Sequence, residues 1–224
     1  MSRNRTLDLN EFLKRSTDLV FSLVALMCLS PIIAVIALAI FLSDFHSPIF
    51  AGERVGMDGR LFKMLKFRSM QMGSDKNGPS STSVNDPRIT RIGSLIRRTK
   101  LDEIPQLWNV IRGEMSMVGP RPQVRWAVDL YTPEELQLVS VRPGLTDYAS
   151  LMFREEGQIL AESTDPDGDY LRLIAPMKNR LGLHYVKTSN VFTDLRIMVA
   201  TCIAVMGLNP IRLLPQSVRD IYIE

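Results

Sequence analysis

An uncharged, apolar stretch dominates the N-terminal part of the chain. It runs from Leu19 to Leu42 and is bounded by Asp18 and Asp44. At about 1.5 Å per residue, a helix of this length reaches across the roughly 30 Å hydrocarbon core of a bilayer. A cleavable signal peptide has a shorter apolar core and a small-residue cleavage site. The pattern therefore predicts a membrane helix that stays in the mature protein.

The middle of this stretch contains Ser30-Pro31. Proline removes one backbone donor and clashes with the preceding turn, so the helix must kink or break there. The Ser30 hydroxyl is placed to bond a carbonyl that the proline frees.

Basic residues flank the stretch on both sides, and the positive-inside rule therefore places both flanks in the cytoplasm. They are Arg3, Arg5, Lys14 and Arg15 before it, and Arg54, Arg60, Lys63, Lys66 and Arg68 after it. A re-entrant helix-break-helix hairpin with Ser30-Pro31 at its apex would keep both basic flanks on the cytoplasmic side. A kinked helix that spans the membrane, with an ambiguous charge signal, is the alternative that the residues leave open.

The rest of the chain is predicted to form one compact cytoplasmic domain, residues 49–224, after a basic segment and hairpin in residues 1–48. Its hydrophobic pattern predicts a strand over 60–70, a loop over 73–87, and helices over 89–99, 133–139, 171–185 and 193–208. The expected fold is α+β, mostly helical, with little strand and with amphipathic helices lying at the membrane interface.

Composition narrows the classes of protein. The chain is 46% hydrophobic, which excludes disorder, and its two cysteines exclude a disulfide scaffold. The formal charge of +3 is too small to indicate a nucleic acid partner. A pI of about 9.0 beside an apolar segment fits an anionic membrane surface instead. We therefore expect a lipid bilayer, and no nucleic acid, among the partners.

The candidate chemistry lies at Asp102-Glu103. The following Pro105, and Gly113 as a stop, predict a helix that begins near the two acids and runs to about Arg112. The amide groups and the positive dipole end at a helix start favour ionised carboxylates and bound phosphate. A simple helix-capping role for Asp102 is the alternative.

Cationic residues surround this acidic pair in the sequence. A basic run precedes it, and the rigid turn Gly119-Pro120-Arg121-Pro122 follows it. Two adjacent carboxylates can hold Mg²⁺, and arginines offer bidentate forks to phosphate oxygens, so the arrangement resembles a diphosphate site. Binding of anionic lipid headgroups is the alternative for part of the basic run. The run contains Arg88, Arg91, Arg97, Arg98 and Lys100.

The segment DPRITRIGSLIRRTKLDEIPQLWNVIRGEMSMVGPRP, residues 86–122, resembles the core signature of the bacterial sugar transferases. The resemblance is to small monotopic phosphoglycosyl transferases that act on polyprenol phosphate, and it extends over nearly the whole chain. It includes Ser30-Pro31, Lys66-Phe67-Arg68 and Val141-Arg142-Pro143-Gly144-Leu145-Thr146. Asp147, which follows, stands where family members usually have glycine.

The resemblance implies a Mg²⁺-dependent enzyme of the bacterial inner membrane that acts from the cytoplasmic face in glycoconjugate assembly. Asp102 would attack the β-phosphate of a UDP-sugar, release UMP and pass the phosphosugar to polyprenol phosphate. Glu103 would assist as a Mg²⁺ ligand or a base, so both acids are candidate metal ligands. The candidate phosphate-binding or nucleotide-binding residues are Arg121, Arg97, Arg88, Lys66, Arg68 and Arg142.

Two other function classes stay open. A non-catalytic membrane adaptor would use the basic helix to bind anionic lipid, and an ordinary glycosyltransferase would use the turn Asp165-Pro166-Asp167-Gly168-Asp169 to hold a metal. The sugar and the glycoconjugate pathway are not determined by any motif, and a homodimer is neither required nor excluded.

Overall fold

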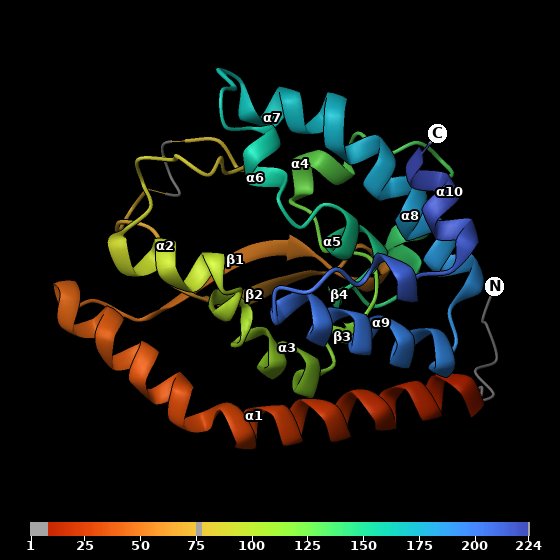
Figure 1. The fold of residues 1–224 in the computed structure, drawn as a ribbon, viewed down its shortest axis with the longest axis horizontal. Helices are drawn as coiled ribbons and strands as arrows, with labels where there is room; N and C mark the ends of the chain where they lie inside the picture. The colour runs from red at the N-terminus through yellow and green to blue at the C-terminus, as the bar shows by residue number, and fades with distance from the viewer. Residues whose placement is uncertain (1–8, 75–77, 224) are drawn as a thin grey trace.

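The computed structural model describes residues 9–74 and 78–223. Its fold is α+β and mostly helical, as predicted, with two small two-stranded sheets among the described residues. Figure 1 shows one long N-terminal helix, α1, along one side of a compact body formed by the rest of the chain. The predicted boundary at residues 48/49 falls between this helix and the first strand.

Helix α1 covers Leu9–Asp44 and contains Pro31. It continues through Ser30-Pro31 and is bent, as Figure 1 shows. Of the predicted kink or break, the structure has the kink: the proline bends the helix and does not interrupt it. The re-entrant path of this helix through a membrane stays a prediction. The Ser30 hydroxyl donates to the Met27 carbonyl at 2.9 Å. This carbonyl is four residues before Pro31 and is the one that the missing amide would have bonded. The predicted role of Ser30 is thus confirmed.

The chain then forms an antiparallel hairpin. Strands β1 (Ile49–Val55) and β2 (Leu61–Phe67) pair from Ile49 with Phe67 to Val55 with Leu61, and a short turn, η1 (Met57–Gly59), joins them. The predicted strand over 60–70 is confirmed as β2. The predicted loop over 73–87 is confirmed for residues 73–74 and 78–87, which contain no helix or strand, whereas residues 75–77 lie outside the described structure. An isolated bridge joins Met70 to Ile89 across this loop.

Two helices and a short turn carry the signature segment. Helix α2 is Arg91–Arg98, the 3₁₀ turn η2 is Leu101–Glu103, and helix α3 is Gln106–Arg112. Thr90 caps α2 by accepting a hydrogen bond from the Gly93 amide at 2.9 Å. Strand β3 (Ser116–Val118) follows and pairs in parallel with β4 (Gly144–Thr146). The turn η2 and helix α3 lie against strand β2, and α3 also contacts α1.

The C-terminal half adds helices around this centre. The helices predicted over 171–185 and 193–208 correspond to η4 with α8 and to α9, and the helix predicted over 133–139 is the 3₁₀ helix η3. The elements are α4 (Arg125–Val128), η3 (Glu135–Ser140), α5 (Tyr148–Met152), α6 (Glu156–Ile159), α7 (Pro166–Asp169), η4 (Tyr170–Ile174), α8 (Ala175–Thr188), α9 (Val191–Val205), η5 (Ile211–Leu213) and α10 (Gln216–Ile223).

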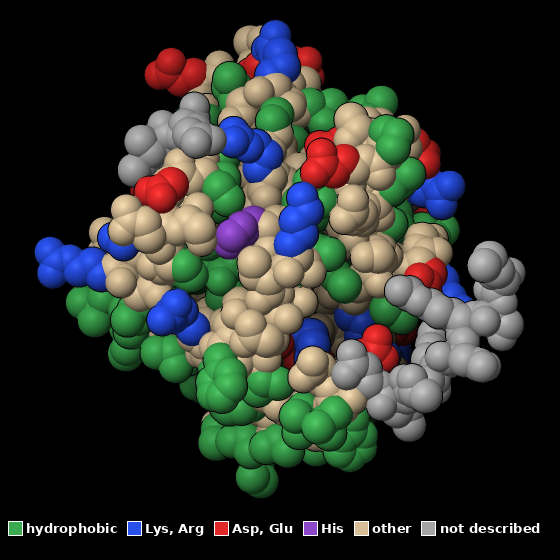
Figure 2. Space-filling view, turned by 90° about the vertical axis from the view of Figure 1, so that its right-hand side faces the viewer, with side chains coloured by type: hydrophobic (Ala, Val, Ile, Leu, Met, Phe, Trp, Pro, Cys, Tyr) green, Lys and Arg blue, Asp and Glu red, His purple; other side chains and the backbone are tan. Residues whose placement is uncertain are grey.

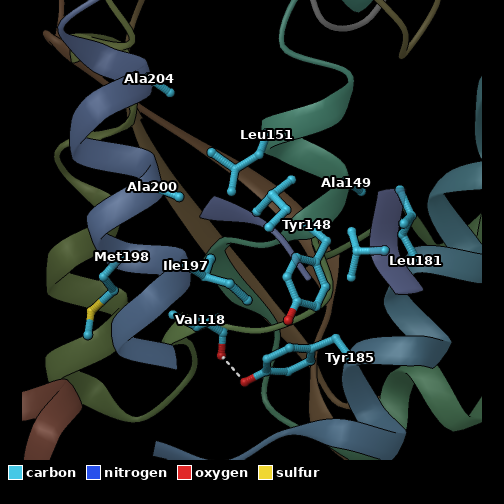
Figure 3. Packing of buried hydrophobic residues seen from close by; sticks show 12 residues of the cluster. Val118, Tyr148, Ala149, Leu151, Leu181, Tyr185, Ile197, Met198, Ala200 and Ala204 are labelled. Atoms are coloured by element: carbon cyan, nitrogen blue, oxygen red, sulfur yellow. Dashed lines mark hydrogen bonds between the residues drawn. The ribbon is translucent and has the colours of Figure 1, made fainter. Parts of the chain in front are cut away.

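The main core lies where α5, α8, α9 and α10 meet strand β3. Tyr148 and Tyr185 are its largest buried side chains; Figure 3 shows the Tyr148 ring between Ile197 and Leu181, with the Tyr185 ring below it. The Tyr185 hydroxyl lies 3.1 Å from the Val118 carbonyl, an interaction marked in Figure 3. The polar tip of a buried tyrosine thus has a partner on β3.

Polar side chains fix the first half of α1 to this body. Lys14 donates to Asp194 at 2.6 Å and to the Val118 carbonyl at 3.0 Å. Arg15 donates to the Val110 and Ile111 carbonyls at the end of α3, at 2.6 and 2.7 Å. The buried Asp18 accepts from the Met117 amide at 2.9 Å. These bonds pair most of the polar groups at an otherwise apolar interface and determine how α1 lies on the domain, while Asp18 Oδ2 is buried without a partner in the described structure.

The outer face of α1 is apolar and exposed. Figure 2 shows hydrophobic side chains gathered along the lower edge of the molecule, where α1 lies. The α9 side chains Phe192, at 84% exposure, and Val199 also point to solvent. By length and composition, α1 is the one helix within residues 9–74 and 78–223 that could cross a membrane. An exposed apolar face of this size favours contact with a lipid bilayer.

Candidate active site

Asp102 and Glu103 lie in the 3₁₀ turn η2, directly before α3. Lys100 precedes the turn in the left-handed region, with φ 58°, and Gly113 ends α3 at φ 80°. A left-handed backbone is uncommon for a lysine, and such conformations concentrate at functional sites. The predicted position of the acidic pair, at the start of a helix that ends at Gly113, is confirmed.

The Asp102 carboxylate is buried and unpaired. Asp102 is 6% exposed, and within the described part of the chain no hydrogen bond or ion pair uses its oxygens. Burial raises the pKa of the Asp102 carboxyl; Lys66 opposes this rise and the neighbouring Glu103 adds to it. Helix α3 starts without a side-chain cap, so the alternative that Asp102 caps this helix is wrong.

Glu103, in contrast, is held by two cations. Lys66 Nζ donates to its Oε1 at 3.0 Å, and the Arg121 guanidinium donates to both of its oxygens, Nη1 to Oε2 at 3.2 Å. Burial alone would raise the pKa of the Glu103 carboxyl, but Arg121 and Lys66 outweigh it and hold this pKa well below its ordinary value. Glu103 therefore stays ionised and is a poor proton acceptor at neutral pH.

Three further cations act on the site. Arg97 and Lys100 attract the Asp102 carboxylate electrostatically. Burial, with repulsion from Arg121, lowers the pKa of Arg54 on strand β1. Arg54 was not among the predicted site residues, because β1 precedes the signature segment by many residues and comes near Arg121 only through tertiary contacts, which include the hydrogen bond from the Val55 amide to the Gln123 carbonyl at 2.9 Å.

Three other predicted phosphate ligands have partners elsewhere. Arg68 forms a bidentate ion pair with Asp44 at 2.5 and 2.6 Å and so holds the end of α1. Arg88 pairs with Asp86 at 2.7 Å, and Arg142 donates to the Gly113 carbonyl at 3.2 Å. None of the three is among the principal charges acting on the acidic pair. Their roles as phosphate ligands stay predictions.

A second set of polar residues borders the site on the side of Arg121. Glu156 forms an ion pair with Lys178. Burial lowers the pKa of Arg121, whereas Glu156 and Asp147 both attract its guanidinium electrostatically and so raise that pKa. Lys178, Asn179, Asp147 and Arg121 line one pocket. Sequence reasoning missed Glu156 and Lys178, because they lie on separate helices, α6 and α8, with no shared motif.

The residues present are compatible with Mg²⁺. The described residues contain no group of three His, Cys, Asp or Glu side chains that could form a protein cage. Mg²⁺ is commonly bound by one or two carboxylates together with substrate phosphates and water. The unpaired Asp102 carboxylate provides such a ligand, whereas both oxygens of Glu103 are already engaged.

A sequence model described as bacterial sugar transferase matches residues 9–207. The chain belongs to the bacterial sugar transferase family. This match includes α1, the hairpin, the acidic pair and Arg121, which are the parts of the structure that build the site.

Three curated relatives of this bacterial sugar transferase illustrate the family. The exopolysaccharide production protein PSS of Rhizobium leguminosarum bv. phaseoli is 38% identical over 199 residues, which cover 86% of this chain and 94% of the relative. The exopolysaccharide production protein ExoY of Sinorhizobium fredii is 34% identical over 207 residues, 86% of this chain and 84% of the relative.

The third relative is the UDP-glucose:undecaprenyl-phosphate glucose-1-phosphate transferase of Escherichia coli. It is 35% identical over 202 residues, which cover 86% of this chain and 40% of the relative. The chain thus spans less than two thirds of the length of several relatives that it matches.

Proposed function

We propose that this chain is a sugar-phosphate transferase that moves a phosphosugar from a UDP-sugar to polyprenol phosphate, with a covalent intermediate on Asp102. The observation that carries the proposal is the buried, unpaired Asp102 carboxylate beside a Glu103 already held by Lys66 and Arg121. Relatives in Escherichia coli and Xanthomonas campestris are named UDP-glucose:undecaprenyl-phosphate glucose-1-phosphate transferases, which supports the same type of reaction.

In the first step, an Asp102 oxygen attacks the β-phosphorus of the UDP-sugar. The bond from β-phosphorus to the bridging oxygen breaks, and UMP leaves with that oxygen. An unpaired carboxylate suits this step, because no hydrogen bond or ion pair has to be broken before its oxygen can react. The surrounding cations Arg97, Lys100 and Lys66 offset the repulsion between the carboxylate and the diphosphate.

In the second step, a phosphate oxygen of polyprenol phosphate attacks the phosphorus of the aspartyl phosphosugar. The bond from phosphorus to the Asp102 oxygen breaks, which regenerates the carboxylate and yields polyprenol-diphosphate-sugar. Mg²⁺, when bound, would neutralise phosphate oxygens in both steps. Glu103 keeps Arg121 and Lys66 in place, so that their remaining donor groups can bind phosphate.

We also propose that α1 enters and leaves the membrane through one leaflet, at the cytoplasmic face of the bacterial inner membrane. The bend in α1, the basic flanks and the apolar outer face support this arrangement. A helix bound in this way would keep the acidic pair near the headgroup plane, where the phosphate of the acceptor lies.

The released nucleotide tests the function. Purified enzyme with Mg²⁺, polyprenol phosphate and a panel of UDP-sugars should release UMP with at least one donor. An ordinary glycosyltransferase would release UDP, because it breaks the bond between sugar and phosphate. A membrane adaptor would release neither. Release of UDP, or no nucleotide release with any donor, would refute the proposal.

A further inference from the structure

We propose that Asp147 recognises the sugar of the donor by accepting hydrogen bonds from its hydroxyl groups, and so selects neutral UDP-sugars over uronic acid donors. This inference rests on the proposed function and extends it to the choice of substrate.

The geometry of Asp147 leaves one carboxylate oxygen available. Asp147 is 3% exposed and caps α5, where its Oδ1 accepts from the Ser150 amide at 2.6 Å. In the described part of the structure, no hydrogen bond or ion pair uses its Oδ2. The residue lines the same pocket as Arg121, Lys178 and Asn179. Its backbone is extended, at φ −160° and ψ 179°, so the fold does not require a special residue there.

Asp147 is the acidic residue lining this pocket, and it has no ion-pair partner in the described structure. Arg121 is paired with Glu103, and Lys178 is paired with Glu156. A buried carboxylate with a free acceptor oxygen favours a neutral ligand that donates hydrogen bonds, and it disfavours a second carboxylate. Sugar hydroxyl groups have the required chemistry, whereas the carboxylate of a uronic acid does not.

The position of Arg121 favours the sugar over the uridine as the ligand of this pocket. Arg121 contacts Glu103, the neighbour of the proposed nucleophile, and also borders the pocket. The sugar is bonded directly to the β-phosphate that Asp102 would attack, whereas the uridine lies beyond the α-phosphate. The group next to the reacting phosphorus should therefore lie closest to Arg121 and Asp147.

Two substitutions test the inference. Asp147→Asn and Asp147→Ser both keep an N-cap side chain and remove the charge. We expect each to lower kcat/KM for the best neutral donor among UDP-glucose, UDP-galactose and their N-acetylamino forms by about tenfold. Use of UDP-glucuronic acid relative to that donor should rise by about tenfold, while inhibition by UMP stays within about twofold.

Asp165→Asn is the matched control, because Asp165 caps α7 through the Gly168 amide at 3.1 Å, is exposed and lies outside the pocket lining. It should leave all donor ratios unchanged. Unchanged ratios in both folded Asp147 variants of an active enzyme would refute this inference alone, and weakened UMP inhibition would reassign Asp147 to the uridine. If wild type releases no UMP with any donor, the proposed function fails and this inference fails with it.

Discussion

The Lys66 ammonium lies 3.0 Å from Glu103 Oε1, while the Asp102 carboxylate, one residue earlier, has no bonded partner in the described structure. Two adjacent acids thus have opposite electrostatic environments. Arg121 and Lys66 keep Glu103 ionised, whereas burial raises the pKa of Asp102. Under the proposed function, this contrast would separate a structural acid, Glu103, from a reactive one, Asp102, a division that the sequence alone left undecided.

Removing the charge of Glu103 should destabilise the protein. Glu103→Gln would leave Lys66 and Arg121 without their shared counter-ion, which we expect to cost on the order of 2 kcal/mol in the free energy of unfolding. Glu134→Gln, at an exposed ion pair with Lys187, is the control and should change stability little. Denaturant unfolding measures the stability of both variants. Equal stability of the two would contradict a stabilising role for the contacts of Glu103 with Lys66 and Arg121.

Arg121→Lys should lower activity by about tenfold or more. An ammonium keeps the charge but cannot bond both Glu103 oxygens and a phosphate with one planar fork. Arg125→Lys, at an exposed pair with Asp129, serves as the control for the chemical change. Full UMP release by the Arg121 variant would show that the guanidinium geometry is dispensable.

Asp102→Asn should stabilise the fold at neutral pH while abolishing turnover. The folded-state pKa of Asp102 is raised, so its protonated form contributes stability below the ordinary carboxyl pKa, and that stability is lost as the pH rises through the folded pKa. The amide carries no charge to desolvate at any pH. The Tm advantage of Asp102→Asn over wild type should therefore grow as the pH rises from about 4.

The matched control is Asp129→Asn, at an exposed carboxylate, and it should show no such growth with pH. Thermal unfolding scans of the three proteins over a pH series provide the comparison. A Tm difference between Asp102→Asn and wild type that does not depend on pH would refute the pKa direction.

The membrane topology can be tested by cysteine labelling. The exposed Cys28 and Cys202 are first replaced by serine, and single cysteines are then introduced at Glu11 and at Glu53, both exposed and on either side of the apolar stretch from Leu19 to Leu42. A membrane-impermeant maleimide should label both from the cytoplasmic face. Labelling from opposite faces would favour the spanning helix. Pro31→Leu should straighten α1 and shift the protein toward spanning.

Much of the fold could be predicted because local signals and tertiary packing agree. Strand β2 and helices α2, α8 and α9 follow apolar patterns that the core uses, and Gly113 ends α3 by its left-handed backbone. At Ser30-Pro31 the sequence predicted a kink or a break, and the structure has a kink, because Ser30 bonds the freed Met27 carbonyl and α1 packs against the domain on both sides of the bend. Strand β1 has no clear alternating pattern and was not predicted.

The predicted site residues that the structure brings together come mainly from one stretch of sequence, and the exception is Lys66, which the family resemblance indicated. Asp102, Glu103 and Arg121 lie within one signature segment, and the structure brings Lys66 to them through β2. Arg68, two residues after Lys66, is instead paired with Asp44 at the end of α1. A basic residue in the sequence does not reveal its partner, because the ion pairs form between segments far apart in the chain.

Covalent capture tests the central claim most directly. Enzyme mixed with Mg²⁺ and an active UDP-sugar, without polyprenol phosphate, should release up to one equivalent of UMP and gain the mass of one phosphosugar on Asp102. This acyl phosphate should be labile to hydroxylamine, and Asp102→Asn should never form it, while Asp129→Asn should form it normally. Absence of both the UMP burst and the adduct, where the complete reaction proceeds, would contradict Asp102 as the nucleophile.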